Sequence, residues 1–455
     1  MTSASKIRDL IEQTPFVDTH EHLIEEEQRL RGETGARLFP CNDWAYLFSH
    51  YIDSDLISAG MPPLDHRRFF APETPIEEKY RLLAPWWERA KHTGYAQAIR
   101  HTLRGLYGET ELTAASVYRI AEKYRDLVKP GFYSYVLRDK ANVEHCQVNS
   151  LQRIFMESGQ PDLLRQDLSI VALSTGLNRA QVATECGKTA ETLEEWLEII
   201  DWHFAVYGPR AVAVKNQSAY SRRLDYDPVT PEEAAPLFAR HARAEDSSSR
   251  AVGGIDYRQS AIDDALSPAE VKTLQDFLLR YCVQKATEFG LPVKLHTGYY
   301  AGYGAMPLHR VRRNASDLCP LLRDFPDTRF VLMHIGYPYQ DEFIALAKHY
   351  PNVSIDLCWA WIINPAAGVR FVKEFLMAAP ANKLFTFGGD YIPVEPVFGH
   401  SCIARRGLTQ ALIELVEDGW IAHEETPELI DRLMRGNAHE TFPVPRGAGS
   451  SPVPA

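Results

Sequence analysis

The sequence predicts an α/β fold in which a parallel sheet is covered by helices. Short apolar segments recur near residues 295, 332, 354 and 386, at steps of 37, 22 and 32 residues. Each step has room for one strand and one returning helix, and this alternation is typical of parallel sheets. The spacing alone also allows a doubly wound sheet. Because no phosphate-type glycine-rich loop follows any of these segments, a nucleotide-binding fold is disfavoured.

The first part of the chain predicts one strand and a long insertion. Phe16 to Thr19 is a short β-prone segment that leads directly into His20-Glu21-His22. Residues from about 24 to 130 are polar, rich in aromatic side chains and mostly helical in pattern, so we interpret them as a helical insertion after the first strand. Val143 to Val148 and Leu168 to Leu173 are weaker candidates for the second and third strands.

The second part of the chain has clearer boundaries. Thr192 to Tyr207 has an apolar helical face and ends at Gly208-Pro209. Residues 241–254 have the composition of a loop. Ser267 begins a capping box with proline at the first helical position, and this helix is predicted to end at Gly290. The predicted strands are Ala211 to Val214, Pro292 to Leu295, Phe330 to Met333, Val353 to Leu357 and Leu384 to Phe387.

Composition excludes several classes of protein. The 455 residues carry 49 basic and 60 acidic side chains, a net charge of −11, which argues against a nucleic-acid or anionic-membrane partner. The seven cysteines contain no C-x-x-C pair, so a disulfide scaffold is not expected and a reducing cytoplasm fits better. Length alone would allow three domains. We instead predict a single domain over residues 1–445 and a disordered tail over 446–455, which is rich in Gly, Ser, Pro and Ala.

Polar side chains stand at the carboxyl ends of the predicted strands. The carboxyl ends of parallel strands converge on one face, so residues nearly 400 positions apart can meet there. Imidazoles with a carboxylate are ligands for Zn²⁺ or a similar divalent ion. Each residue alone has an ordinary interpretation, because about 0.56 His-x-His pairs are expected by chance from 16 histidines, and Asp390 could merely cap a turn. The joint pattern predicts a metal site formed by His20, His22, Lys215, His296, His334 and Asp390.

These elements resemble the amidohydrolase superfamily. The matching segments are FVDTHEHL (16–23), VAVKNQSAY (212–220), VKLHTGYY (293–300), FVLMHIGYP (330–338), LFTFGGDYIP (384–393) and RGNAHETF (435–442). The branch resembled is the amidohydrolase-2 type, near glucuronate-isomerase-like proteins and FluG-like γ-glutamyl-amide hydrolases. The resemblance implies a metal-dependent (β/α)8 TIM-like barrel with metal ligands at His20, His22, His296 and Asp390. It also implies a second-metal or catalytic role for His334. Lys215 stands at the position where binuclear members carry a carboxylated lysine that bridges two ions, whereas many amidohydrolase-2 members lack that lysine and use one metal. Zinc is the expected metal, with manganese as an alternative and one or two ions per chain.

Three enzymatic functions and one non-enzymatic function are compatible with such a site. We favour hydrolysis of a C–N bond in a small amide by a metal-activated water, with Asp390 transferring the proton and His334 or a second metal polarising the carbonyl. Non-oxidative decarboxylation of an aromatic or unsaturated acid, and uronate-type isomerisation, would use the same metal. The last alternative is a barrel that binds a small molecule without chemistry.

Substrate contacts are expected on the loops that follow the strands. An arginine there could hold a carboxylate, and aromatic rings could flank a planar group, although these aromatic residues could equally pack the loops onto the barrel. We expect a small-molecule substrate and a homo-oligomer. The candidate substrate-binding residues are Tyr220, Arg223, Tyr299, Trp359 and Trp361.

Overall fold

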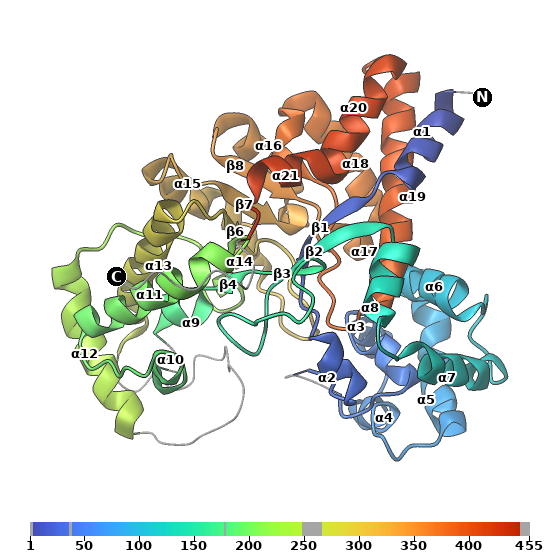
Figure 1. The fold of residues 1–455 in the computed structure, drawn as a ribbon, viewed down its shortest axis with the longest axis horizontal. Helices are drawn as coiled ribbons and strands as arrows, with labels where there is room; N and C mark the ends of the chain where they lie inside the picture. Colours follow the sequence, from blue (N-terminus) through green and yellow to red (C-terminus); the bar gives the residue numbers. More distant parts are fainter. Residues whose placement is uncertain (1–2, 36–38, 177–178, 248–265, 446–455) are drawn as a thin grey trace.

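The computed structural model describes residues 3–35, 39–176, 179–247 and 266–445 (Figure 1). All strand pairs within this part of the chain are parallel and form two sheets, in the orders β1-β2-β3 and β4-β5-β6-β7-β8-β9. The predicted disordered tail at 446–455 lies outside the described residues. The strands are β1 (Phe16–Glu21), β2 (Val143–Val148), β3 (Leu164–Gln166), β4 (Leu168–Ser169), β5 (Val214–Asn216), β6 (Val293–Leu295), β7 (Phe330–Met333), β8 (Val353–Asp356) and β9 (Leu384–Phe385).

Backbone hydrogen bonds join the two sheets into one closed barrel. Only Asp167 separates β3 from β4, and its N–H donates to the carbonyl of Val148 at 2.8 Å, so these two short strands occupy one position in the barrel. At the other junction, Thr19 N–H donates to Phe387 O at 3.0 Å and Asp390 N–H donates to His20 O at 2.9 Å. The described strands therefore fill eight positions, and the predicted α/β barrel is confirmed.

Helices surround this barrel and cover its outer face (Figure 1). The chain enters β1 from α1 (Ser3–Gln13). The helices after β4 are α9 (Val171–Thr175), α10 (Arg179–Cys186), α11 (Leu193–Tyr207), α12 (Pro231–Ser247), α13 (Pro268–Glu288), α14 (Leu308–Val311), α15 (Asn314–Asp324), α16 (Gln340–His349), α17 (Ala360–Ile363), α18 (Pro365–Ala378), α19 (Glu395–Glu417), α20 (Thr426–Asp431) and α21 (Asn437–Thr441). None of the helices in the described part of the chain is long and apolar enough to cross a membrane.

The segment between β1 and β2 is mainly helical and packs against one end of α19 (Figure 1). This contact is close because small residues lie at it: a Cβ on Gly105 would collide with the ring of Phe398, and one on Gly399 would collide with the carbonyl of Ala98. A buried ion pair between Arg29 and Glu395, 2.9 Å apart, joins the start of the segment to α19. Its helices are α2 (Glu26–Leu30), α3 (Ile52–Ser58), α4 (Pro63–Phe69), α5 (Ile76–Ala90), α6 (Gly94–Tyr107), α7 (Ser116–Leu127) and α8 (Phe132–Ser134).

Several predicted boundaries differ from the structure. The predicted strand at 211–214 is observed at 214–216, so Lys215 lies inside β5 instead of following it. The predicted third strand ends at Ser169, because the chain turns into α9 from residue 171. The prediction of a loop from residue 241 is wrong for residues 241–247, because α12 extends to Ser247. The Ala, His, Arg and Glu residues before the serines are compatible with a helix. Residues 248–254 of that prediction lie outside the described residues.

Capping chemistry explains why two helices begin where they were predicted. Ser267 Oγ accepts from Glu270 N–H at 3.4 Å while the Glu270 carboxylate accepts from Ser267 N–H at 2.8 Å. Thr192 and Glu195 form the same reciprocal arrangement at the start of α11. Both pairs satisfy N–H groups that the first helical turn leaves without partners.

Candidate metal centre

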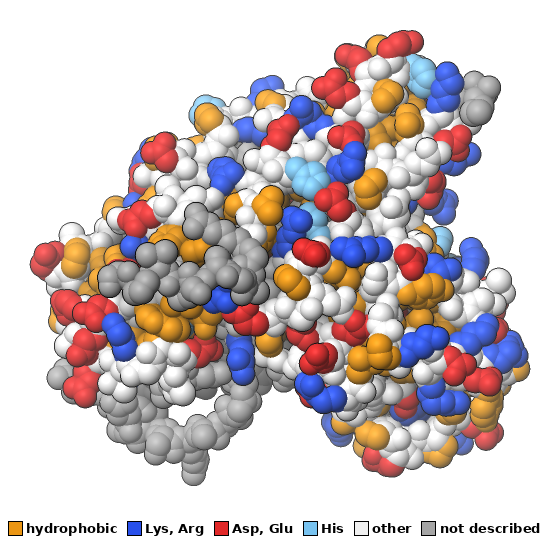
Figure 2. Space-filling view, in the orientation of Figure 1, with side chains coloured by type: hydrophobic (Ala, Val, Ile, Leu, Met, Phe, Trp, Pro, Cys, Tyr) orange, Lys and Arg blue, Asp and Glu red, His pale blue; other side chains and the backbone are white. Residues whose placement is uncertain are grey.

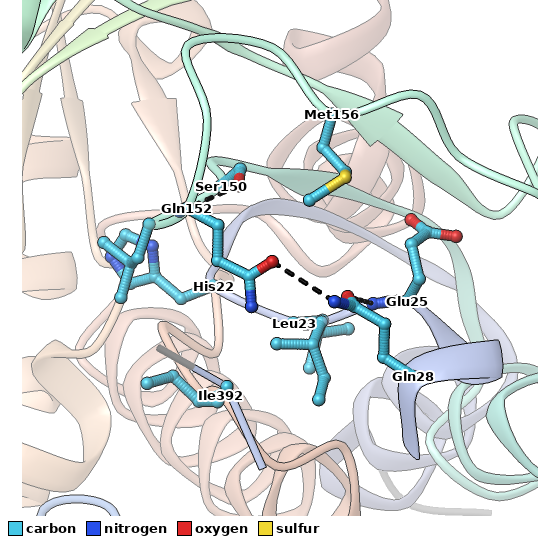
Figure 3. Close-up of a pocket in the computed structure, with 11 residues that line it drawn as sticks. His22, Leu23, Glu25, Gln28, Ser150, Gln152, Met156 and Ile392 are labelled. Atoms are coloured by element: carbon cyan, nitrogen blue, oxygen red, sulfur yellow. Dashed lines mark hydrogen bonds between the residues drawn. The ribbon is translucent and has the colours of Figure 1, made fainter. Parts of the chain in front are cut away.

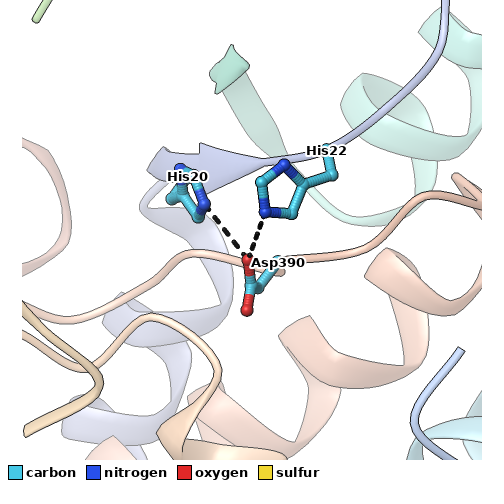
Figure 4. A group of neighbouring side chains, drawn as sticks. All are labelled: His20, His22 and Asp390. Atoms are coloured by element: carbon cyan, nitrogen blue, oxygen red, sulfur yellow. Dashed lines mark ion pairs between the residues drawn. The ribbon is translucent and has the colours of Figure 1, made fainter. Parts of the chain in front are cut away.

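Three predicted ligands meet where β1 and β9 end. His20 Nε2 lies 3.1 Å from Asp390 Oδ1, and His22 Nε2 lies 3.3 Å from the same oxygen, so all three side chains point toward one another (Figure 4). Ligand atoms held about 2.0–2.1 Å from one zinc ion lie about 3.0–3.4 Å apart. The donor atoms of these three residues therefore already have the separations that a divalent ion requires.

Neighbouring groups fix which atom of each side chain faces the cluster. His22 Nδ1 lies 2.7 Å from the carbonyl of Asn149, which requires its proton there and leaves Nε2 as the lone-pair donor. Tyr51 O–H donates to Asp390 Oδ2 at 2.5 Å, which leaves Oδ1 for the two histidines. Asp390 follows Gly388-Gly389, and a Cβ on Gly389 would collide with the Glu21 carboxylate, so a glycine is required for this approach.

Lys215 lies beside the same cluster. Its Nζ is 3.4 Å from His20 Nε2 and 2.9 Å from the sulfur of Met333, in a buried position. Burial lowers the pKa of this amine to about 8, although the nearby Asp390 carboxylate opposes the shift. The neutral amine is therefore accessible near neutral pH, and the structure brings Lys215 to the position predicted for a ligand.

His296 and His334 form a second pair of imidazoles. His334 Nδ1 lies 3.0 Å from the carbonyl of Cys358, and His296 Nε2 lies 2.9 Å from the carbonyl of Tyr299. If each of these nitrogens donates, neutral rings leave His334 Nε2 and His296 Nδ1 facing each other with two lone pairs at 3.0 Å. Two converging lone pairs repel unless a proton or a cation lies between them. This arrangement fits a divalent ion.

Burial sets the charge state of the whole cluster. Burial lowers the pKa values of His20, His296 and His334 well below the usual value of 6.5, so these rings are neutral as metal ligands must be. Burial also raises the pKa of Asp390 to about 7, against the opposing effects of Lys215 and the Tyr51 hydrogen bond. A carboxyl group with a pKa near 7 can either bind a cation in its charged form or exchange a proton at neutral pH.

Comparison with known proteins finds a family that matches the C-terminal part of the chain. Residues 257–444 match the family described as amidohydrolase. Over 245 residues, or 52% of this chain, the sequence is 25% identical to the protein fluG of Emericella nidulans, and the matched part covers only 26% of that protein. The match over residues 257–444, the barrel and the ligand cluster together support the amidohydrolase superfamily for this chain.

Solved structures with the same fold include two sugar-acid isomerases. A uronate isomerase from Thermotoga maritima gives a TM-score of 0.74 at 16% identity and covers 97% of both chains. A glucuronate isomerase from Caulobacter crescentus gives a TM-score of 0.74 at 16% identity, over 96% of this chain and 93% of that one. At this level of identity the likeness concerns the fold.

Two residues of this candidate site were not identified from the sequence. Tyr51 comes from the insertion, directly before α3, and contacts Asp390. Cys358 lies two residues after β8, and its sulfur, a nitrogen of His334 and an oxygen of Asp390 all lie within 4.8 Å of one another. The only sequence signal for Cys358 was its position after an apolar strand.

Three of the five predicted substrate-binding residues lie at the metal centre. The Tyr220 ring is 4.5 Å from that of His296, and the Trp359 ring is 5.3 Å from that of His334. The Tyr299 ring is 5.8 Å from that of Trp359. The buried Trp359 indole N–H has no acceptor among the described residues. These rings form an aromatic wall beside the ligands.

The other two predicted contacts are engaged elsewhere. Arg223 binds Asp317 through two hydrogen bonds of 3.0 and 2.6 Å, so its guanidinium is already paired. Trp361 donates to the carbonyl of Thr386 at 2.8 Å and packs against Gly407, where a Cβ would collide with its ring. Both side chains therefore have structural partners, and the arrangement does not bring them to the ligand cluster.

A pocket opens next to His22 (Figure 3). His22 is the most accessible of the three ligands at the β1 end, with 11% of its side chain exposed. The pocket wall carries Ser150 and Gln152 from the loop after β2, and Gln28 from α2, whose amide donates to Gln152 at 3.2 Å. On the outer face shown in Figure 2, acidic and basic side chains are interspersed. The pocket therefore places amide and hydroxyl groups, together with the Glu25 carboxyl group, beside His22.

Proposed function

We propose that the protein hydrolyses a C–N bond of a small amide, using a divalent ion, most simply zinc. The observation that carries this proposal is the convergence of all six predicted ligand residues, from His20 to Asp390, on one face of the barrel. A divalent ion bound there would lower the pKa of a coordinated water and polarise a substrate carbonyl. Manganese is the alternative metal, and the donor set has room for one or two ions.

Asp390 is the group best suited to move the proton. Its pKa, raised by burial to about 7, allows it to accept a proton from water and return it to the leaving nitrogen near neutral pH. Tyr51 holds Oδ2 of the same carboxyl at 2.5 Å and thereby limits its rotation. The geometry favours a ligand role for His334, because its Nδ1 faces a carbonyl and its neutral Nε2 has no proton to donate.

The aromatic wall and the pocket beside His22 are the proposed substrate contacts. Tyr220, Tyr299 and Trp359 lie together beside the ligands, and the buried Trp359 indole N–H has no acceptor among the described residues. Gln152, Ser150 and the Glu25 carboxyl group supply polar contacts in the pocket beside His22. This combination suits a small amide with a planar or apolar part.

Uronate isomerisation is the second candidate, and it is supported by the names of the solved structures with the same fold. A uronate needs a cation for its carboxylate, and the arginine predicted for that role, Arg223, is paired with Asp317. Because of this pairing, we favour amide hydrolysis over isomerisation. Decarboxylation of an aromatic acid is third, because a lysine beside the ligands suits water activation better than carboxylate binding.

A substrate panel with three separate readouts tests the proposal. Zinc-loaded protein is incubated with amides, γ-glutamyl amides, uronates and aromatic acids, and amine release, ketose formation and CO₂ are measured. We expect amine release, reduced about 10²–10⁴-fold in Asp390→Asn with metal content measured in parallel. Asp341→Asn, an exposed carboxylate 3.5 Å from Arg370, is the control. Ketose formation without amine release, or full turnover by metal-loaded Asp390→Asn, would refute the proposal.

A further inference from the structure

Cys358 lies inside the barrel mouth, among the metal ligands. The side chain is buried, and its sulfur lies within 4.8 Å of ligand atoms of both His334 and Asp390. The nearest hydrogen-bond contact of the sulfur is a long one, 4.0 Å to the carbonyl of His20. A Cβ on Gly388 would lie 2.9 Å from this sulfur, so the glycine there leaves room for the thiol at this point.

We propose that Cys358 is a metal ligand and that it defines a second ion position together with His334 and Asp390. Zinc binds thiolate sulfur at about 2.3 Å and imidazole nitrogen at about 2.0–2.1 Å, so two such ligand atoms around a tetrahedral ion lie about 3.5 Å apart. The ligand atoms of the observed group lie within 4.8 Å of one another, and side-chain shifts of up to about 1 Å bring the three atoms around one ion.

The surroundings of this group already prepare it for a cation. The backbone carbonyl of Cys358 fixes Nδ1 of His334, so the lone pair of His334 Nε2 is available on the other side of the ring. His296 Nδ1 lies 3.0 Å from that nitrogen and provides a fourth donor. Asp390 belongs to both groups of candidate ligands.

This ligand set has consequences that the imidazole and carboxylate ligands alone would not have. A thiolate favours zinc and other soft ions over manganese or magnesium. It also supports a second ion without carboxylation of Lys215. The ordinary alternative is a buried thiol that only fills space at the end of a strand. The proposal rests on the metal centre of the proposed function and is independent of which substrate bond is broken.

Metal analysis and cobalt spectroscopy test the assignment without using activity. The full-length protein and its Cys358→Ala, Cys358→Ser and Cys282→Ala variants are loaded with Zn²⁺ or Co²⁺ and dialysed. Cys282 is an equally buried cysteine in α13 and serves as the matched control. We expect two ions per chain in the wild type and Cys282→Ala, and one in both Cys358 variants. We also expect a thiolate-to-cobalt charge-transfer band that both Cys358 variants lose.

Two results would overturn this assignment: one ion per wild-type chain, or a cobalt spectrum that the Cys358 substitutions leave unchanged. Thermal unfolding of each variant distinguishes loss of a ligand from loss of the fold, and the isosteric serine keeps the volume of the side chain. Amine release is scored separately, so failure of the second ion position is distinguishable from failure of amide hydrolysis.

Discussion

Tyr51 is the residue outside the ligand set whose removal should most clearly weaken metal binding. Its O–H donates to Asp390 Oδ2 at 2.5 Å and also contacts the backbone carbonyl of Asp390. Tyr51→Phe deletes this donor and keeps the ring, which stacks on Tyr95 at 5.2 Å and on Trp359 at 4.8 Å. The substitution therefore frees the Asp390 carboxylate to rotate without opening a cavity.

The size of the effect follows from the kind of hydrogen bond that is lost. A hydrogen bond to a charged group contributes about 1.5–3 kcal/mol, and loss of a group that orients a metal ligand weakens metal affinity about 10–100-fold. Those two estimates agree, because about 1.4 kcal/mol corresponds to each factor of ten in a dissociation constant. We expect a zinc Kd raised about 10–100-fold in Tyr51→Phe, together with a lower melting temperature of the metal-free protein, which loses the same hydrogen bond.

Competition with a chromophoric chelator measures this Kd directly. Tyr95→Phe is the matched control, because it alters a tyrosine that stacks on the same ring and for which no hydrogen bond to a metal ligand is observed. Asp390→Asn is the positive control for loss of a ligand. A zinc affinity of Tyr51→Phe within about twofold of wild type would refute the argument that Tyr51 orients Asp390.

Three further predictions concern stability. Glu395→Gln should cost about 3–5 kcal/mol in urea unfolding, because it leaves the buried Arg29 charge without its partner, and a loss below about 1 kcal/mol would contradict this. Burial raises the pKa of Asp18 to about 7, so the metal-free protein should lose stability as the pH rises from about 4 through 7. Asp18→Asn should flatten that melting-temperature profile, whereas the exposed Asp341→Asn should not; a wild-type profile flat over this range would count against the shift. Chelation should lower the melting temperature, since zinc at 100 times its Kd stabilises by about 2.7 kcal/mol, and equal melting temperatures with and without chelator would argue against a bound ion.

The fold and most of the ligand cluster were accessible from the sequence for one physical reason. The strands of a parallel barrel begin on one side and end on the other, so side chains at strand ends meet regardless of their distance along the chain. His20 and Asp390 are 370 positions apart and 3.1 Å apart in space. The apolar character of each strand up to its polar end was enough to predict this convergence.

The support around the ligands was not accessible, because it depends on tertiary contacts that leave no periodic signal. Tyr51 reaches Asp390 only because the insertion folds against α19 through glycines such as Gly105, and no pattern near residue 51 records that contact. Arg223 shows the converse: its position after β5 suggested a substrate contact, and its partner Asp317 lies 94 positions away in α15. The substrate contacts remain predictions.

Backbone strain is the feature of the site that was least predictable from the sequence. Six non-glycine residues of the described chain have positive φ, and four of them, Tyr51, His334, Trp359 and Asp390, lie at the metal centre. Each such conformation costs about 1–3 kcal/mol and persists only when the surrounding structure holds it. Backbone bonds supply that support, as where Trp359 N–H donates to Gly388 O at 2.9 Å and Asp390 N–H to His20 O at 2.9 Å. A sequence selected for stability alone would avoid these strained backbone conformations. Their grouping is therefore best explained by the need to direct four side chains toward one point.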